Sequence, residues 1–281
     1  MFLYRSRFST RGEVWFDEQP DGARADWIYH RQRSSPLTNY RWHGFYTLLI
    51  DIGKSPLELF AEMDDKTARR ITEAQGKDKV RCERCDSKDP KVLDEVGQMW
   101  NQFALAQKTP LLDRPWLDQF SQAGALDVVA AKDPAGRVLV YHLVLLRQKR
   151  ARQLIAISHY HRAPDVAWRA AVSRANSLIH WHNFLTYREE GIRFFDFGGW
   201  YPGTTNIQYL GFNQFKKGFG GKVVLEYDCK QPVTVKGRIL LMAAEVLARV
   251  RRAGALSDDT AAKPKERDVT NEENTVSAAV R

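Results

Sequence analysis

The sequence predicts an α/β fold of the α+β kind, in which a mixed and mostly antiparallel sheet is flanked by helices. Three apolar segments follow one another with short turns between them, as in an antiparallel meander. One apolar strand early in the chain and another late in it are each joined directly to a long helix. The meander strands are expected at 125–131, 138–146 and 153–158.

The first 44 residues are expected to form a β-hairpin arm. Apolar and aromatic segments lie on both sides of a Pro-Asp-Gly turn signal at 20–22. The apolar run 45–52 is bounded by glycines and predicts a buried strand. The start signature Ser-Pro-Leu-Glu at 55–58 then predicts a helix that continues to residue 75.

The later elements follow from the same start and stop signals. Asp89-Pro90 opens one helix, and Gly191 ends a long one whose chain then enters a buried strand. The expected strands are 79–85, 192–197 and 223–227, and the expected helices are 90–107, 115–123, 166–190, 206–218 and 235–252.

These elements divide the chain into four parts. We expect a hairpin arm at 1–44, one α/β domain at 45–230, a C-terminal helix at 231–253 and a disordered tail at 254–281. The tail is rich in charge, alanine and threonine and has no aromatic residue, so it has little apolar surface to bury. With 43% hydrophobic residues among 281, the rest of the chain can bury one substantial core.

The charge balance favours an anionic partner. The 43 Lys and Arg residues exceed the 34 Asp and Glu residues and leave a net charge of +9, which suits nucleic acid, a phosphorylated precursor, a nucleotide or a membrane surface. Three cysteines and the lack of an apolar leader after Met1 predict a cytoplasmic protein. The last helix is expected to pack on the domain, and its basic ends leave peripheral contact with the inner membrane surface as the alternative.

Two motifs near the end of the predicted domain resemble a known family. The strand at 192–197 ends in Phe194-Phe195-Asp196-Phe197-Gly198-Gly199, and Phe215-Lys216-Lys217-Gly218-Phe219-Gly220-Gly221 follows after a loop. In both motifs the chain resembles the Fem-type (FemAB-like) aminoacyltransferases of the GNAT superfamily, and the basic helix around 63–71 is a weaker similarity. The resemblance implies a GNAT-like sheet with a cleft where two strands, here 153–158 and 192–197, splay apart. Family members usually carry two such modules, and this chain has room for one.

The resemblance also implies an activity. We expect an acyl- or aminoacyltransferase that acts on an amine of a cell-envelope or exopolysaccharide precursor, as in peptidoglycan or polysaccharide biosynthesis. Its partners would be that precursor and an anionic donor, either acyl-CoA or aminoacyl-tRNA, with no tightly bound cofactor. The alternative is a non-catalytic module of the same fold that binds RNA or an anionic glycan.

Asp196 and Lys216 are the expected catalytic residues. Asp196 alternates with phenylalanines in a buried strand, so its charge needs a partner. Its carboxylate either accepts the proton of the amine or positions the acceptor, or it has a structural role in an ion pair or in backbone hydrogen bonds. Lys216 precedes a glycine-rich turn, where its ammonium group suits a phosphate or a developing oxyanion, or is simply solvated. The resemblance implies contacts of Lys216, more than of Lys217, at the transfer site.

The expected substrate-binding residues lie on the same loops and on the basic helix. They are Gly198, Gly199, Trp200, Tyr201, Lys217, Lys66 and Arg69. The glycines either expose backbone amides to a substrate or form a tight turn, and the aromatic pair either stacks on a sugar or base or plugs the end of the sheet.

The loop 159–165 is expected to bind the donor through His161 and Arg162. It lacks the glycines that coenzyme A enzymes of this superfamily place there, which favours aminoacyl-tRNA without excluding acyl-CoA. Apart from Asp165, no carboxylate or cysteine lies at ligand spacing from the histidines, so no metal site is expected.

Overall fold

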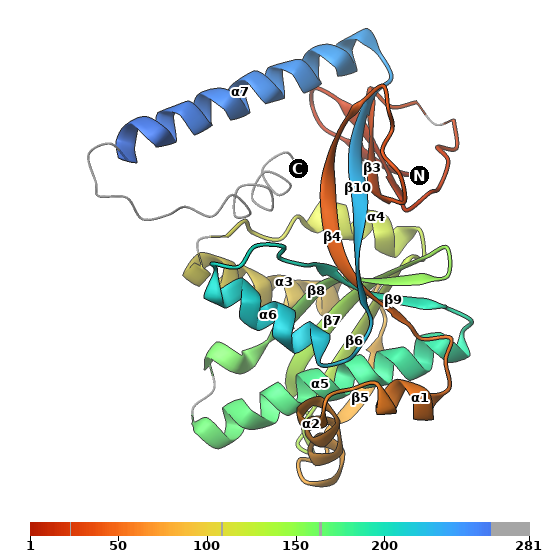
Figure 1. Ribbon diagram of the computed structural model, residues 1–281, viewed down its shortest axis with the longest axis vertical. Helices are drawn as coiled ribbons and strands as arrows, with labels where there is room; N and C mark the ends of the chain where they lie inside the picture. The colour runs from red at the N-terminus through yellow and green to blue at the C-terminus, as the bar shows by residue number, and fades with distance from the viewer. Residues whose placement is uncertain (23, 108, 163–164, 260–281) are drawn as a thin grey trace. The chain divides into compact units, whose positions relative to one another are not determined.

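The computed structural model describes residues 1–22, 24–107, 109–162 and 165–259 (Figure 1). Their contacts define two compact units. Unit 1 comprises Met1–Phe45, Gly203–Asn206 and the chain from Leu225 onward, and unit 2 comprises Tyr46–Pro202 and Ile207–Val224.

Unit 2 is built on six strands that are hydrogen-bonded in the order β4-β9-β8-β7-β6-β5. All neighbours in this order are antiparallel except β8 and β9, which are parallel. The strands are β4 (Arg41–Asp51, which begins in unit 1), β5 (Arg81–Cys85), β6 (Leu126–Lys132), β7 (Val138–Arg147), β8 (Arg150–Ser158) and β9 (Phe194–Gly199). The mixed, mostly antiparallel sheet predicted from the sequence is therefore confirmed.

Both faces of these strands are buried, and Figure 1 shows α5 lying across one of them. Val129 belongs to the core cluster that includes α5, while its strand neighbour Val128 and Leu143, which pairs with Val128, are equally buried. Because successive strand residues point to opposite faces, both faces are covered. The helices of unit 2 are α1 (Pro56–Ala61), α2 (Asp65–Gly76), α3 (Pro90–Gln107), α4 (Arg114–Gln122), α5 (Val166–Glu189) and α6 (Ile207–Lys217), with a 3-10 turn η1 at His159–Arg162.

The single helix predicted over 56–75 is wrong, because the chain forms two helices there. The Asp64 carboxylate caps α2 by accepting a hydrogen bond from the Thr67 N–H at 2.7 Å. The Asp64 N–H donates to the carbonyl of Gly218 at 2.9 Å instead of continuing the ladder of α1. A partner distant in sequence thus interrupts the helix.

The two strands that were expected to splay apart pair only where they begin. Arg150 lies opposite Phe194, and Arg152 lies opposite Asp196. Within the described residues no later pair joins the two strands, although β8 continues to Ser158 and β9 to Gly199. The parallel pairing therefore stops directly after Asp196.

Unit 1 contains strands hydrogen-bonded in the order β1-β2-β3-β10. They are β1 (Phe2–Arg5), β2 (Thr10–Trp15), β3 (Trp27–Arg33) and β10 (Lys222–Pro232, which begins in unit 2). The hairpin predicted across residues 20–22 is wrong, because β2 and β3 are parallel, and it is β1 and β2 that pair antiparallel. The reason is Asp26, whose backbone and carboxylate both bond Thr10, so the chain returns to the beginning of β2 before β3 starts.

The last helix of unit 1, α7 (Val235–Asp259), is longer than expected. The disordered tail predicted for 254–281 is wrong for residues 254–259, which are helical, and its remaining residues lie outside the described part of the chain. Gly237 packs so closely on Asp26 that a Cβ atom would lie 1.8 Å from its carbonyl oxygen. Among the described helices, none is both long and apolar enough to cross a membrane.

Candidate active site

The carboxylate of Asp196 is fully buried at the point where β8 and β9 stop pairing. Phe195 and Phe197 on either side belong to the core cluster that includes α5, so the alternation of the strand sends Asp196 to the opposite face. There it accepts hydrogen bonds from the hydroxyl of Thr47 and, at 2.7 Å, from the N–H of Gly198.

Two arginines of β8 balance the charge of Asp196. Arg150 donates to Oδ2 from Nε at 3.0 Å and from Nη2 at 2.5 Å, and the Nε of Arg152 lies 3.5 Å from the same oxygen. Burial raises the pKa of Asp196, but the two guanidinium groups, together with the hydrogen bonds from Thr47 and Gly198, outweigh it and hold this pKa below its usual value. This arrangement has the features of a structural ion pair, which is one of the roles that the sequence left open for Asp196.

Gly198 allows Arg152 to approach the backbone. Its φ is +73°, and a Cβ atom there would lie 2.3 Å from Nη1 of Arg152. The N–H of Gly198 is already bonded to Asp196. Gly198 lies inside β9 where the register with β4 shifts, so its positive φ belongs to a bulge within the strand and not to the tight strand-to-loop turn considered from the sequence.

Lys216 reaches from the last turn of α6 to the end of β9. Its Nζ donates to the carbonyl oxygens of Gly198, at 3.4 Å, and Gly199. Burial and the charge of Arg152 lower the pKa of Lys216 to about 8, against the opposing effect of Asp196. The lysine can therefore exchange a proton near neutral pH. With Lys216 protonated, the cluster holds more cations than carboxylates, which suits an anion or a developing oxyanion.

The other predicted basic residues are not brought into this cluster. Lys217 is exposed on α6, and Lys66 and Arg69 are exposed on α2. Arg69 lies 4.0 Å from Glu73, one turn further along the same helix. Among the described ion pairs and hydrogen bonds, none connects these three residues to Asp196 or Lys216.

The aromatic loop after β9 is anchored by its backbone. The N–H of Trp200 donates to the carbonyl of Tyr46 at 2.7 Å. The side-chain amide of Asn213 bonds both the N–H of Tyr201, at 3.1 Å, and its carbonyl, at 2.7 Å. The Tyr201 side chain is buried. Its burial agrees with the second of the two expected roles, in which it plugs the end of the sheet.

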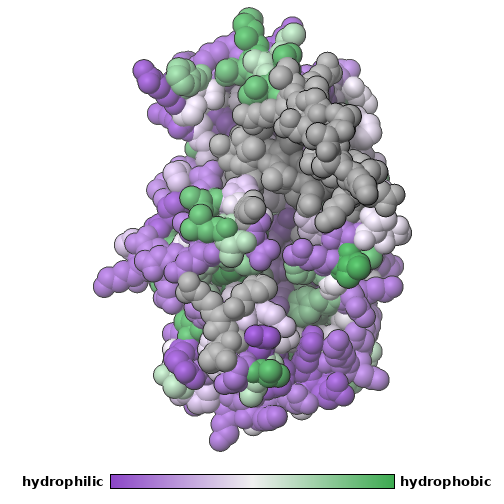
Figure 2. Space-filling view, turned by 90° about the vertical axis from the view of Figure 1, so that its left-hand side faces the viewer, coloured by the Kyte–Doolittle hydropathy of each residue, from purple (hydrophilic) through white to green (hydrophobic). Residues whose placement is uncertain are grey.

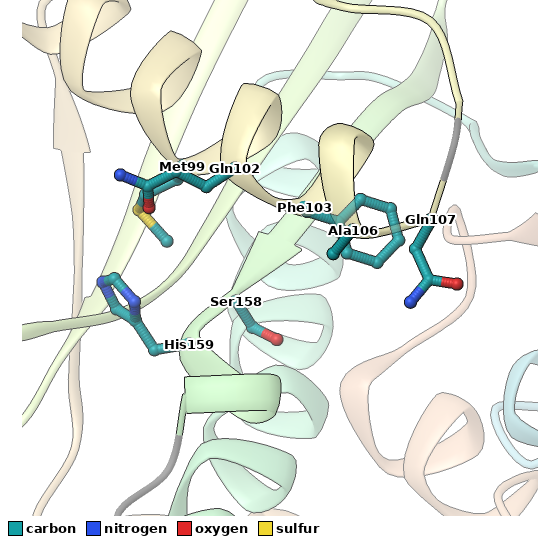
Figure 3. Close-up of a pocket in the computed structure, with 7 residues that line it drawn as sticks. All are labelled: Met99, Gln102, Phe103, Ala106, Gln107, Ser158 and His159. Carbon is teal, nitrogen blue, oxygen red and sulfur yellow. The ribbon is translucent and has the colours of Figure 1, made fainter.

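A pocket of about 400 Å³ lies beside the far end of β8 (Figure 3). In Figure 3 the side chains of α3 face Ser158 and His159 across it. The predicted donor-binding residues His161 and Arg162 follow in η1, but their side chains lie outside the described residues. The helix lines the pocket with Met99, Gln102, Phe103, Ala106 and Gln107.

A buried polar network between β8 and α5 was missed from the sequence. The Nε2 of His180 lies 3.2 Å from the amide oxygen of Gln153, and the His180 ring stacks on Phe197. His142 bonds the side chains of Asn176 and Asn183. The signal for this network is the spacing of residues 176, 180 and 183, which places three polar side chains on one face of α5.

Arg150 and Arg152 were also missed, because the strand was expected to begin at residue 153. Two signals could have found them. A buried aspartate requires a cationic or hydrogen-bonding partner, and residues two apart in a strand share a face.

No protein-family model and no curated protein sequence matches the chain. Solved structures do match it. The crystal structure of FemX aligns with a TM-score of 0.54 at 14% identity, over 68% of this chain and 63% of the FemX chain. L-PGS from Bacillus licheniformis aligns with a TM-score of 0.50 at 12% identity, over 76% of this chain and 71% of that one. This chain thus spans less than two thirds of the FemX chain. At these identities the likeness concerns the fold, and the chain has the FemAB/GNAT-like fold that its two motifs predict.

Proposed function

We propose that this chain is an acyl- or aminoacyltransferase that modifies an amine of a cell-envelope or exopolysaccharide precursor. The observation that carries the proposal is the ammonium group of Lys216, with its lowered pKa, at the end of β9. The fold likeness to FemX and to L-PGS supports the same class of reaction.

In this reaction the nitrogen of the acceptor attacks the carbonyl carbon of the donor. A C–N bond forms, the bond from that carbon to the oxygen or sulfur of the donor breaks, and the proton released by the nitrogen passes to the leaving oxygen or sulfur. Negative charge develops on the carbonyl oxygen in the transition state. We assign protonated Lys216 to donate a hydrogen bond to this oxygen, with Arg152 adding positive charge beside it.

We assign Asp196 the role of a positioning residue. Its carboxylate is held by Thr47, Gly198 and Arg150, so we do not propose that it accepts the proton of the amine. It fixes the backbone of Gly198, whose carbonyl accepts a hydrogen bond from Lys216. Asp196 therefore acts on the reaction through the placement of its neighbours.

The donor in this proposal is aminoacyl-tRNA or acyl-CoA. Both are polyanions and match the net charge of +9. The absence of glycine from the sequence between β8 and α5 favours aminoacyl-tRNA. We place the reaction in the cytoplasm, at the inner face of the membrane where envelope precursors are assembled.

The test is an intact-mass analysis of an acceptor pool. The purified chain is incubated with an extract of small envelope precursors and with either total aminoacylated tRNA or acetyl-CoA. A donor-dependent mass increment is expected with the wild type and with Lys222→Met, which changes an exposed lysine, and its loss is expected with Lys216→Met.

Two results together would contradict the proposal. One is the absence of any increment with either donor class. The other is retention of RNA or an anionic glycan by the same protein, with an affinity that falls steeply as salt is raised. That combination identifies a binding module instead of an enzyme.

A further inference from the structure

We propose that one face of α7 rests on the surface of an anionic phospholipid bilayer. The apolar residues of this face recur at spacings of four, three and four, which places them on one stripe of the helix. Their exposed fractions are 78% for Val235, 61% for Ile239, 60% for Met242 and 60% for Val246. We call these four residues the α7 stripe.

The α7 stripe lies on the side of the helix away from its packing face. Gly237 is buried against Asp26, and Leu241 and Ala244 are half-buried at positions that continue the face of Gly237 along the helix. Since 100° separates successive helix residues, this packing face is turned about half a circle from the stripe. The stripe is therefore not used for packing within unit 1.

The α7 stripe is a row of exposed apolar side chains along one helix. On the face shown in Figure 2, hydrophobic residues form small groups separated by hydrophilic ones. Exposed apolar residues that line up along one element mark an interaction site more often than scattered ones do.

The charges beside the stripe select the partner. Lys236 and Arg238 border it on opposite sides, and the side chain of Lys236 remains 58% exposed while it contacts Asp26. From Val235 to Arg252 the sequence contains five basic residues and one acidic residue, Glu245. Glu245 is neutralised by an ion pair with Arg41.

An apolar stripe bordered by cations matches the boundary between acyl chains and anionic headgroups. The apolar side chains enter the acyl region, and the ammonium and guanidinium groups remain among the phosphates. A second copy of the helix fits less well, because pairing two stripes would bring their basic borders together. The helix lies along the surface in this arrangement, because its other face stays packed on Asp26.

The test is vesicle flotation of the full chain, without donor or acceptor. Vesicles consist of phosphatidylcholine alone or of phosphatidylcholine mixed with phosphatidylglycerol. We expect binding to the mixed vesicles only, with a partition coefficient reduced about tenfold or more in the Ile239→Gln/Met242→Gln/Val246→Gln variant. Lys236→Gln/Arg238→Gln should also weaken binding and make it less sensitive to salt.

The matched control is Leu57→Gln/Val166→Gln, which changes two apolar residues of unit 2 that are 82% and 79% exposed. It should bind like the wild type. Equal flotation of the wild type and the triple variant, or no binding of the wild type to phosphatidylglycerol, would show that the proposal is wrong. So would a dimer that the triple variant converts to a monomer without any effect on flotation. Failure here leaves the transferase proposal intact, because the assay measures no transfer.

Discussion

Asp196, Arg152 and Lys216 come from three different elements and meet around the backbone of Gly198 and Gly199. Their charges set one another's protonation. Arg152 helps to keep Asp196 ionised, and the same guanidinium group helps to lower the pKa of Lys216 to about 8. The arginines of β8 are thus as important to the candidate site as the two residues that the motifs identify.

Gly198→Ala should destabilise the protein and disturb the site. The new Cβ would lie 2.3 Å from Arg152, and the backbone φ of +73° disfavours any side chain. We expect a loss of about 1–3 kcal/mol in the free energy of unfolding, measured by urea denaturation. Gly211→Ala is the matched control, because no atom lies within 4 Å of its Cβ position. Equal unfolding midpoints for Gly198→Ala and the wild type would contradict this account.

Asp196→Asn tests the ion cluster. It leaves Arg150, only 8% exposed, beside a neutral amide, and breaking a buried pair costs about 3–5 kcal/mol. Thermal unfolding at neutral pH should show a lower midpoint. The folded pKa of Asp196 is below the usual 3.8, so its contribution is present above pH 3.8 and is lost as the pH falls through the folded value. A variant as stable as the wild type at neutral pH would argue against the cluster.

The local sequence pattern predicted the positions of helices and strands more accurately than it predicted how the strands pair. The meander strands and the helices α3 to α6 follow from periodicity and from start and stop residues, which are local properties. The break between α1 and α2 depends on Gly218, and the parallel pairing of β2 with β3 depends on the bond between Thr10 and Asp26. Such partners are distant in sequence, so no local pattern indicates them.

Asp64→Ala should weaken the start of α2. The substitution removes the carboxylate that accepts from the Thr67 N–H at 2.7 Å. We expect a loss of about 1 kcal/mol in the free energy of unfolding, measured by urea denaturation. Asp64→Asn keeps an oxygen in place to accept the same hydrogen bond and should retain most of the stability. If the alanine and asparagine variants unfold at the same urea concentration, the cap contributes nothing.

For the whole molecule, the fold class could be predicted from the motifs around residues 194–221, and part of the candidate site with it. Asp196, Gly198, Gly199 and Lys216 do meet. The arginines on β8 and the polar network on α5 were missed, because the residues that contact them lie on other elements and are brought to them only by folding. A buried charge requires a partner, but the residues next to it in the sequence do not identify that partner.

Stability should fall as the solution is acidified from pH 6.5. Burial lowers the pKa of His142 from 6.5 to about 4, against the opposing bond to Asn176. The unfolded chain therefore binds a proton near pH 6.5 and the folded chain only near pH 4, so about 3 kcal/mol is lost across this window. Burial also lowers the pKa of His180, which acts in the same direction.

Urea unfolding at a series of pH values measures this effect. His142→Gln should flatten the pH dependence. A wild-type stability that is constant between these two pH values would show that His142 is not buried in its neutral form.

The pH dependence of kcat/KM for the transfer reaction tests the central claim most directly. For the wild type, kcat/KM should decline as the pH rises through about 8. Above that pH Lys216 loses its positive charge, and with it the charged hydrogen bond to the oxyanion. Lys216→Arg keeps its charge throughout this range, so its lower activity should show no such decline. A wild-type profile without a limb near pH 8, or the same limb in Lys216→Arg, would contradict the assignment of Lys216.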